Sequence, residues 1–129
     1  MPTFILSFIL AFGSFATAAL STLQQIDVKT FEKMREVERY QIKIAETHFL
    51  KGSFKIALAE YEKFLTLYEK SAGAPYAQLM WSHTMMKLKK PKTALREGFQ
   101  SVIDYWPESL EATIASYCMG DAYLSLIHI

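Results

Sequence analysis

Apolar and polar residues along this chain recur at three- and four-residue steps, the spacing that gathers side chains on one face of an α-helix. Residues 51–70, KGSFKIALAEYEKFLTLYEK, show this most clearly. Their apolar stripe consists of Ala57, Leu58, Tyr61, Phe64, Leu65 and Tyr68. Gly52 is suited to end the helix before it, and Ser53 to cap the helix that follows. The pattern predicts an amphipathic helix beginning near residue 53.

Similar stripes predict further helices on both sides of this one. They cover residues 31–51, 75–88 and 91–106, and a last helix is expected to begin at Ser109, a capping residue. No stretch alternates apolar and polar residues between turn residues, so no strand is predicted. The expected fold class is all-α. Because the connections are short, neighbouring helices should run antiparallel as hairpins.

The predicted hairpins are repeated along the chain. At a spacing of 37 residues, Gln41, Ala45, Ala57, Leu58, Glu60 and Tyr68 align with Gln78, Ser82, Ala94, Leu95, Glu97 and Tyr105. At a spacing of 38 residues, Ala74, Ala77, Trp81 and Ser82 align with Ala112, Ala115, Met119 and Gly120. We expect the one-residue offset to be absorbed in a turn. Repetition has a physical reason, since a single amphipathic hairpin buries its apolar face only by stacking on a neighbour.

The first 26 residues differ from the rest because they carry no charged side chain. Phe4–Phe12 form an almost unbroken apolar run, and Ala16-Thr17-Ala18 supplies the small residues of a signal-peptide cleavage site. We therefore expect export with cleavage after Ala18 or Ala19. The alternatives are a retained membrane anchor over residues 4–20 and a buried helix of a soluble protein.

Charge excludes some functions and leaves others open. The chain has 14 Lys and Arg against 13 Asp and Glu, so net charge gives no argument for binding nucleic acid. Every base lies between residues 27 and 96, whereas residues 97–129 hold five acids and no base. The single cysteine, Cys118, cannot form an internal disulfide.

Small and aromatic residues at fixed places give the repeats a family resemblance. Ala45 and Ala57 with Phe54 and Tyr61, then Ser82 with Ala94, then Gly120 with Tyr123 resemble the tetratricopeptide repeat. The phrase VIDYWPESLEATIASYCMGDAY is similar to the longer-helix variant of bacterial envelope proteins, among them outer-membrane-assembly and Tol-Pal-associated components. The resemblance implies a short right-handed solenoid of stacked hairpins. The chain departs from the pattern in its longer period, and Gly98 stands where a bulky residue is usual.

The resemblance divides the chain into segments. We expect a signal peptide or anchor over 1–19, a helical extension over 20–36 and repeats over 37–129, split into 37–73, 74–110 and an incomplete 111–129. A solenoid normally ends in a helix with a polar outer face. This chain instead ends in Leu124, Leu126, Ile127 and Ile129. Our hypothesis is that it is the beginning of a longer protein and that its last few residues are foreign to the gene.

In such a solenoid the first helix of each hairpin lines a concave groove. The candidate groove residues are Arg39, Ile42, Glu46, Phe49, Tyr76, Leu79, His83, Lys87, Ile114, Tyr117 and Asp121. A mixture of aromatic and charged groups suits an extended or helical peptide. The alternative is that many of these residues only pack between repeats.

A dense basic run follows the groove residues. The candidate basic patch is Lys87, Lys89, Lys90, Lys92 and Arg96. Lysines at the carboxyl end of a helix are favourable as a solvated turn. The alternative is a contact for an acidic partner or an anionic lipid surface, and RNA is disfavoured because no aromatic residues are interleaved.

Residues that could carry chemistry lack the spacing that chemistry requires. The three histidines, His48, His83 and His128, show no metal-ligand spacing, so no metal or other cofactor is expected. Cys118 and His83 could pair as nucleophile and base on adjacent first helices, but no third orienting residue is visible. We expect a non-enzymatic scaffold for a protein or peptide partner in the bacterial cell envelope, touching membrane only through its amino-terminal segment. The alternatives are self-association through the unfinished last repeat and a role as part of a larger enzyme.

Overall fold

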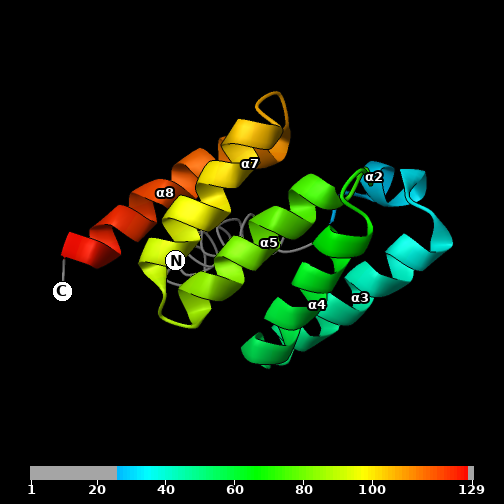
Figure 1. Cartoon of the computed structure of the whole chain (residues 1–129), viewed down its shortest axis with the longest axis horizontal. Coiled ribbons are helices and arrows are strands. Elements are labelled where there is room, and N and C mark those ends of the chain that lie inside the picture. Colours follow the sequence, from blue (N-terminus) through cyan, green and yellow to red (C-terminus); the bar gives the residue numbers. More distant parts are fainter. Residues whose placement is uncertain (1–25, 128–129) are drawn as a thin grey trace, which may run out of the picture.

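The computed structural model describes residues 26–127, and in this range the chain is built from helices and turns (Figure 1). In chain order the elements are α2 (Val28–Lys33), α3 (Glu36–Leu50), α4 (Phe54–Leu67), α5 (Ala74–Lys87), α6 (Pro91–Thr93), the π-helix η1 (Ala94–Phe99), α7 (Gln100–Tyr105) and α8 (Leu110–Ile127). The all-α prediction is confirmed, and the helices stack on one another. The predicted signal peptide or anchor lies outside the described residues, as does Ile129.

Local signals explain where the helices begin and end. Gly52 adopts the positive φ of 80° that ends α3. Ser109 accepts a hydrogen bond from the Ala112 amide at 3.0 Å and so caps α8, as its sequence position predicts. Ser53 occupies the capping position of α4, but its hydroxyl makes no capping hydrogen bond. The turn between α3 and α4 therefore depends on Gly52 more than on Ser53.

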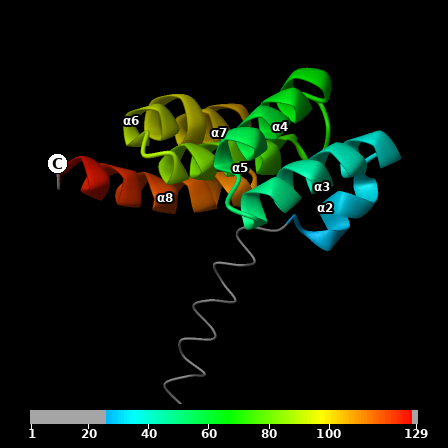
Figure 2. The same ribbon diagram turned by 90° about the horizontal axis from the view of Figure 1, so that it is seen from below.

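Two helical hairpins follow one another, as the two views show (Figures 1 and 2). In the first hairpin α3 packs on α4; in the second, α5 packs on the continuous run of α6, η1 and α7. The Gln41 side-chain amide donates to the Glu60 carbonyl at 2.9 Å, and the Gln78 amide donates to the Glu97 carbonyl at 3.4 Å. A bond of the same kind therefore joins the paired helices in each hairpin, an arrangement compatible with the predicted repeat. Helix α8 stacks on the second hairpin.

The core lies where these layers meet. Its largest fully buried apolar side chains are Tyr61, Phe64, Phe99, Ile42, Leu79, Met80 and Val102. Four alanines, Ala45, Ala57, Ala77 and Ala94, are also completely buried. Small side chains at these places let the helix axes approach, while the large ones fill the space between layers.

The one-residue offset between copies lies inside a helix, so its predicted place in a turn is wrong. At the start of the second helices, Ala57 donates to the Ser53 carbonyl and Ala94 to the Lys90 carbonyl, a shift of 37 residues. At their ends, Tyr68 donates to the Phe64 carbonyl and Trp106 to the Val102 carbonyl, a shift of 38 residues. The extra residue therefore falls within η1, whose wider π-helical turn accommodates it.

Gly98 is the extra residue. Glu60 and Glu97 occupy equivalent places in the two hairpins, and Tyr61 and Phe99 are the completely buried aromatic residues that follow them. A Cβ at Gly98 would lie 2.7 Å from the Cβ of Ser82 and 3.1 Å from its Cα, which is too close. The missing side chain thus lets η1 pack against α5.

The alignment of Tyr68 with Tyr105 is also corrected by the offset. Trp106 occupies the place equivalent to Tyr68, and both side chains are partly buried. Tyr105 instead has 75% of its surface exposed. The insertion of Gly98 rotates the rest of the helix by one position, so the sequence match at 37 residues paired a core-facing tyrosine with an outward-facing one.

Candidate functional site

Polar contacts join the first helices of successive copies. The Tyr76 hydroxyl of α5 donates to Glu46 Oε1 of α3 at 2.9 Å. The Cys118 Sγ of α8 lies 3.8 Å from Nε2 of His83 on α5. The candidate groove residues of α3, α5 and α8 therefore adjoin one another from copy to copy.

Burial divides the candidate groove residues into three groups. Ile42, Glu46, Phe49, Tyr76 and Leu79 are buried. Arg39, His83 and Ile114 are partly buried, and Lys87, Tyr117 and Asp121 are exposed. The accessible groove residues of the second and third copies thus lie on α5 and α8, whereas the first copy contributes only Arg39.

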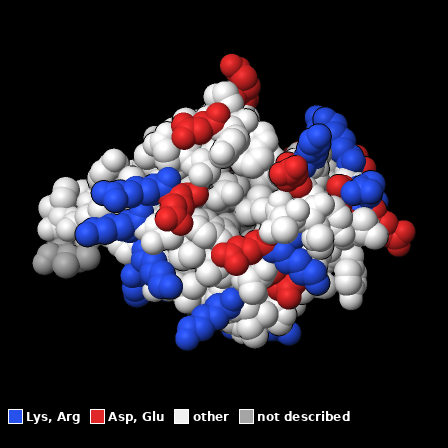
Figure 3. Space-filling model, in the orientation of Figure 1, with Lys and Arg blue, Asp and Glu red and all other residues white. Residues whose placement is uncertain are grey.

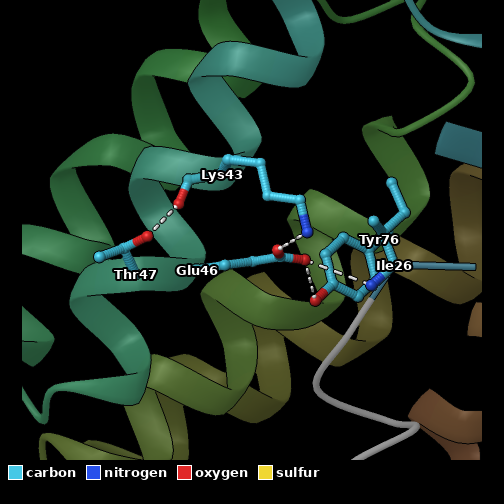
Figure 4. A network of polar contacts seen from close by, with 5 residues as sticks. All are labelled: Ile26, Lys43, Glu46, Thr47 and Tyr76. Atoms are coloured by element: carbon cyan, nitrogen blue, oxygen red, sulfur yellow. Dashed lines mark hydrogen bonds and ion pairs between the residues drawn. The ribbon is translucent and has the colours of Figure 1, made fainter.

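Glu46 is a buried carboxylate whose two oxygens both accept hydrogen bonds (Figure 4). Oε1 accepts from the Ile26 backbone amide at 3.2 Å as well as from Tyr76, and Oε2 accepts from Lys43 Nζ at 3.0 Å. A buried charge is tolerated when it is paired and hydrogen-bonded in this way. Burial, followed by the charge of Glu46, raises the pKa of Tyr76 above its usual range, so the hydroxyl stays a donor. Glu46 therefore stabilises the fold and has little capacity left for a ligand.

Arg39 is likewise used within the chain. Its Nε donates to the Phe31 carbonyl at 2.8 Å, and its Nη2 donates to the Glu32 carbonyl at 2.5 Å. The guanidinium also lies over the Phe31 ring, 5.5 Å from the centroid. These contacts hold α2 against α3.

The accessible groove residues adjoin a thiol on α8. We call His83, Lys87, Tyr117, Cys118 and Asp121 the α5–α8 surface. His83 packs edge-on against Phe99, with 5.5 Å between ring centroids. Burial, and after it the charge of Lys87, lowers the pKa of His83 to about 4, although Asp121 partly opposes the shift. The imidazole is therefore neutral at pH 7.

Cys118 is also neutral at that pH. Burial, and after it the charge of Asp121, raises the pKa of the Cys118 thiol to about 11. Catalytic cysteines need the opposite shift, toward a thiolate stabilised by a cationic imidazole. The geometry brings the predicted pair together, but it leaves the thiol unactivated. Within residues 26–127 no group of three His, Cys, Asp or Glu side chains could hold a metal ion.

The candidate basic patch runs from the carboxyl end of α5 to η1. All five of its side chains are exposed. Figure 3 shows basic side chains gathered on this side of the molecule. In the part of the chain that the structure describes, the ion pairs are Arg35–Glu38 and Lys43–Glu46, and neither includes a patch residue. Lys87 belongs to both the patch and the α5–α8 surface.

The family remains unassigned by comparison with known proteins. Scans of family models, curated proteins and solved structures find no match. In the described range, no helix combines the length and apolarity that a membrane span requires.

Sequence reasoning missed the network around Glu46. A signal was present, because Glu46 lies on a helical face with Ile42, Ala45 and Phe49, which the apolar spacing directs toward a core. A carboxylate on such a face is expected to have partners within the fold. Ile26 bonds to Glu46 through its backbone amide, so its side chain gives no indication of this contact in the sequence.

Proposed function

We propose that this protein is a non-enzymatic, tetratricopeptide-like scaffold that binds a protein segment on the α5–α8 surface. The observation that carries the proposal is the exposure of Lys87 on α5 and of Tyr117 and Asp121 on α8, two helices that the His83–Cys118 contact joins. The uncharged, signal-like residues 1–26 support action in the bacterial cell envelope after export. The stacked hairpins support a short solenoid.

The chemistry of the α5–α8 surface suits recognition of a peptide. Tyr117 has 84% of its surface exposed, so its ring can serve as an anchor for an apolar side chain. Lys87 and Asp121 offer opposite charges and form no ion pair within residues 26–127. Charged groups near an aromatic anchor favour one direction and register of the bound segment.

The state of the Cys118–His83 pair supports binding without bond chemistry. With the thiol pKa near 11 and the imidazole pKa near 4, proton transfer between them would create two charged groups that their surroundings disfavour. A neutral pair of this kind contributes packing and a weak polar contact. In the proposal, Cys118 and His83 only pack α8 against α5 and so support the exposed residues.

Selection from a displayed library of short peptides tests this proposal. Peptides selected on the full chain should lose at least about tenfold in affinity, or 1.4 kcal/mol, on charge reversal by Lys87→Glu or Asp121→Lys. Lys63→Glu and Glu69→Lys are the matched controls, because both residues are exposed and lie on or after α4. Binding that all four variants retain, or a library that yields no specific peptide, would contradict a recognition site here.

A further inference from the structure

Among residues 26–127, nothing covers an uncharged, largely apolar face of α8. It consists of Thr113, Ser116, Tyr117, Gly120, Tyr123, Leu124 and Ile127, which we call the α8 stripe. Its large side chains are well exposed: Tyr117 84%, Ile127 75%, Leu124 55% and Tyr123 53%. The residues recur at three- and four-residue steps and so share one side of the helix. Ala115 and Ala122, on the other side, are completely buried.

The repeats show what covers the equivalent face in the other copies. In the first hairpin, Gln41 and Ala45 are buried where α3 packs on α4. In the second, Gln78 bonds to η1 and Ser82 is buried against Gly98. The equivalent residues of α8 are Ser116 and Gly120, which are exposed, and a Cβ at Gly120 would meet nothing within 4 Å. An antiparallel helix covers this face in both earlier copies, so the same kind of occupant fits the third.

The α8 stripe is complementary to itself. If two α8 helices run antiparallel about a two-fold axis at Gly120, residues equally distant from Gly120 lie opposite one another. Tyr123 of one copy then faces Tyr117 of the other, Leu124 faces Ser116, and Ile127 faces Thr113. Glycine at the crossing point leaves room there, Leu124 and Ile127 meet the smaller Ser116 and Thr113, and the tyrosines pair with one another on either side of the crossing.

We propose that two copies of this chain associate by antiparallel packing of α8 on α8, with the helices crossing at Gly120. A buried aromatic residue contributes about 150–250 Å². Two tyrosines and two aliphatic residues from each copy therefore approach the roughly 1,000 Å² in total expected of a specific interface. An interface near this lower limit implies a reversible dimer.

The salt dependence of association distinguishes this dimer from one held together by charge. The basic first two-thirds and the acidic end of the chain could instead attract one another head to tail. Such an assembly weakens as salt screens its charges, whereas contacts along an uncharged stripe persist. Tyr117 belongs also to the α5–α8 surface, so the dimer and a bound peptide compete for it. The variants used here lie outside that surface and change the dimer contact without altering the residues proposed to bind a peptide.

Sedimentation equilibrium of the full chain, at about 0.05 M and about 0.5 M NaCl, tests the proposal. The key variant is Leu124→Lys, and its matched control is Leu67→Lys on α4, because the two leucines are 55% and 56% exposed. We expect wild type and Leu67→Lys to form the same concentration-dependent dimer at both salt levels. Leu124→Lys should raise the dissociation constant at least tenfold, because it places a charge in the apolar contact.

Gly120→Arg provides a second variant with the same expected effect, since the structure leaves room for a side chain there in the monomer. Circular dichroism should show equal helix content in all the variants. Three results would overturn the proposal: a monomer at every concentration, which leaves the stripe to a helix other than α8; a dimer lost at high salt; or a dimer that persists in both Leu124→Lys and Gly120→Arg. The last result would place association elsewhere in the chain.

Discussion

The two hairpins perform the same packing task with helices of different length. In the first, α4 is a regular α-helix between Ser53 and Tyr68. In the second, the equivalent run from Lys90 to Trp106 has one more residue and contains the π-helix η1. Both keep the glutamine bond to the partner helix and a completely buried aromatic residue after it. The comparison teaches that a packed helix can include an extra residue when that residue has no side chain and faces its neighbour.

Single-residue deletions give the largest expected contrast between the hairpins. Deleting Ala59 from α4 should turn the following residues by about 100° and remove Tyr61 and Phe64 from the core, at a cost above about 3 kcal/mol. Deleting Gly98 should convert η1 to a regular α-helix and change the free energy of unfolding by less than about 1 kcal/mol. Urea unfolding followed by circular dichroism measures both. Equal losses from the two deletions would show that Gly98 is not the extra residue.

The first helices also differ at one equivalent position, which is Glu46 on α3, His83 on α5 and Asp121 on α8. This difference should make the stability of the fold depend on pH. Glu46 is buried and paired, His83 is partly buried beside Cys118, and Asp121 is exposed. The pKa of His83 falls from 6.5 to about 4 on folding, so between these pH values the unfolded chain binds a proton that the folded chain does not. Stability from this group is therefore full above pH 6.5 and declines as the pH falls toward 4. The decline should be on the order of 2–3 kcal/mol.

Substitution isolates this contribution from those of the other titrating groups. We expect His83→Gln to be less pH-sensitive than wild type between pH 6.5 and 4, since glutamine keeps polar atoms but does not titrate. Urea unfolding at a series of pH values provides the measurement. The control is His48→Gln, which removes a histidine from α3 instead of from α5. Parallel stability curves for wild type and His83→Gln would rule out a depressed histidine pKa.

Two helical glycines should respond to alanine with opposite sign, and this is the smallest of the expected effects. Alanine ordinarily stabilises a helix by about 0.5–1 kcal/mol relative to glycine. Gly120→Ala should show this gain, because nothing lies within 4 Å of the new Cβ. Gly98→Ala should instead destabilise by about 1–2 kcal/mol, because its Cβ would clash with Ser82.

These measurements are best made by thermal or urea unfolding at a protein concentration low enough to keep the chain monomeric. Ser82→Gly in the Gly98→Ala background should recover part of the loss, since it removes two of the contacting atoms. A Gly98→Ala protein as stable as Gly120→Ala would mean that η1 does not pack closely on α5.

Helical periodicity was sufficient to predict the fold class, because the apolar stripe of each helix can be recognised from the residues of that helix alone. It also predicted which alanines are buried, namely Ala45, Ala57 and Ala94. The extra residue escaped prediction because residues 105 and 106 are both aromatic, so Tyr105 matches Tyr68 in sequence although Trp106 occupies the equivalent place.

The candidate site was harder to predict from the sequence, because it depends on how the helices pack on one another. A list of residues on the first helices does not say which are covered by the next layer. Ile42 and Leu79 are covered, whereas Tyr117, at the equivalent place on α8, is exposed. Contacts between side chains distant in sequence, such as Tyr76 with Glu46, depend on how the hairpins stack and have no local signature.

The carboxylate of Glu46 has a consequence for how the chain assembles. It joins Ile26, 20 residues before it, to Tyr76, 30 residues after it, so neither contact forms early through local structure. The Ile26 amide should exchange its hydrogen with solvent until the second hairpin has docked on α3 and positioned the acceptor. This one backbone proton can therefore report the cooperative closure of the hairpins, independently of helix formation within either of them.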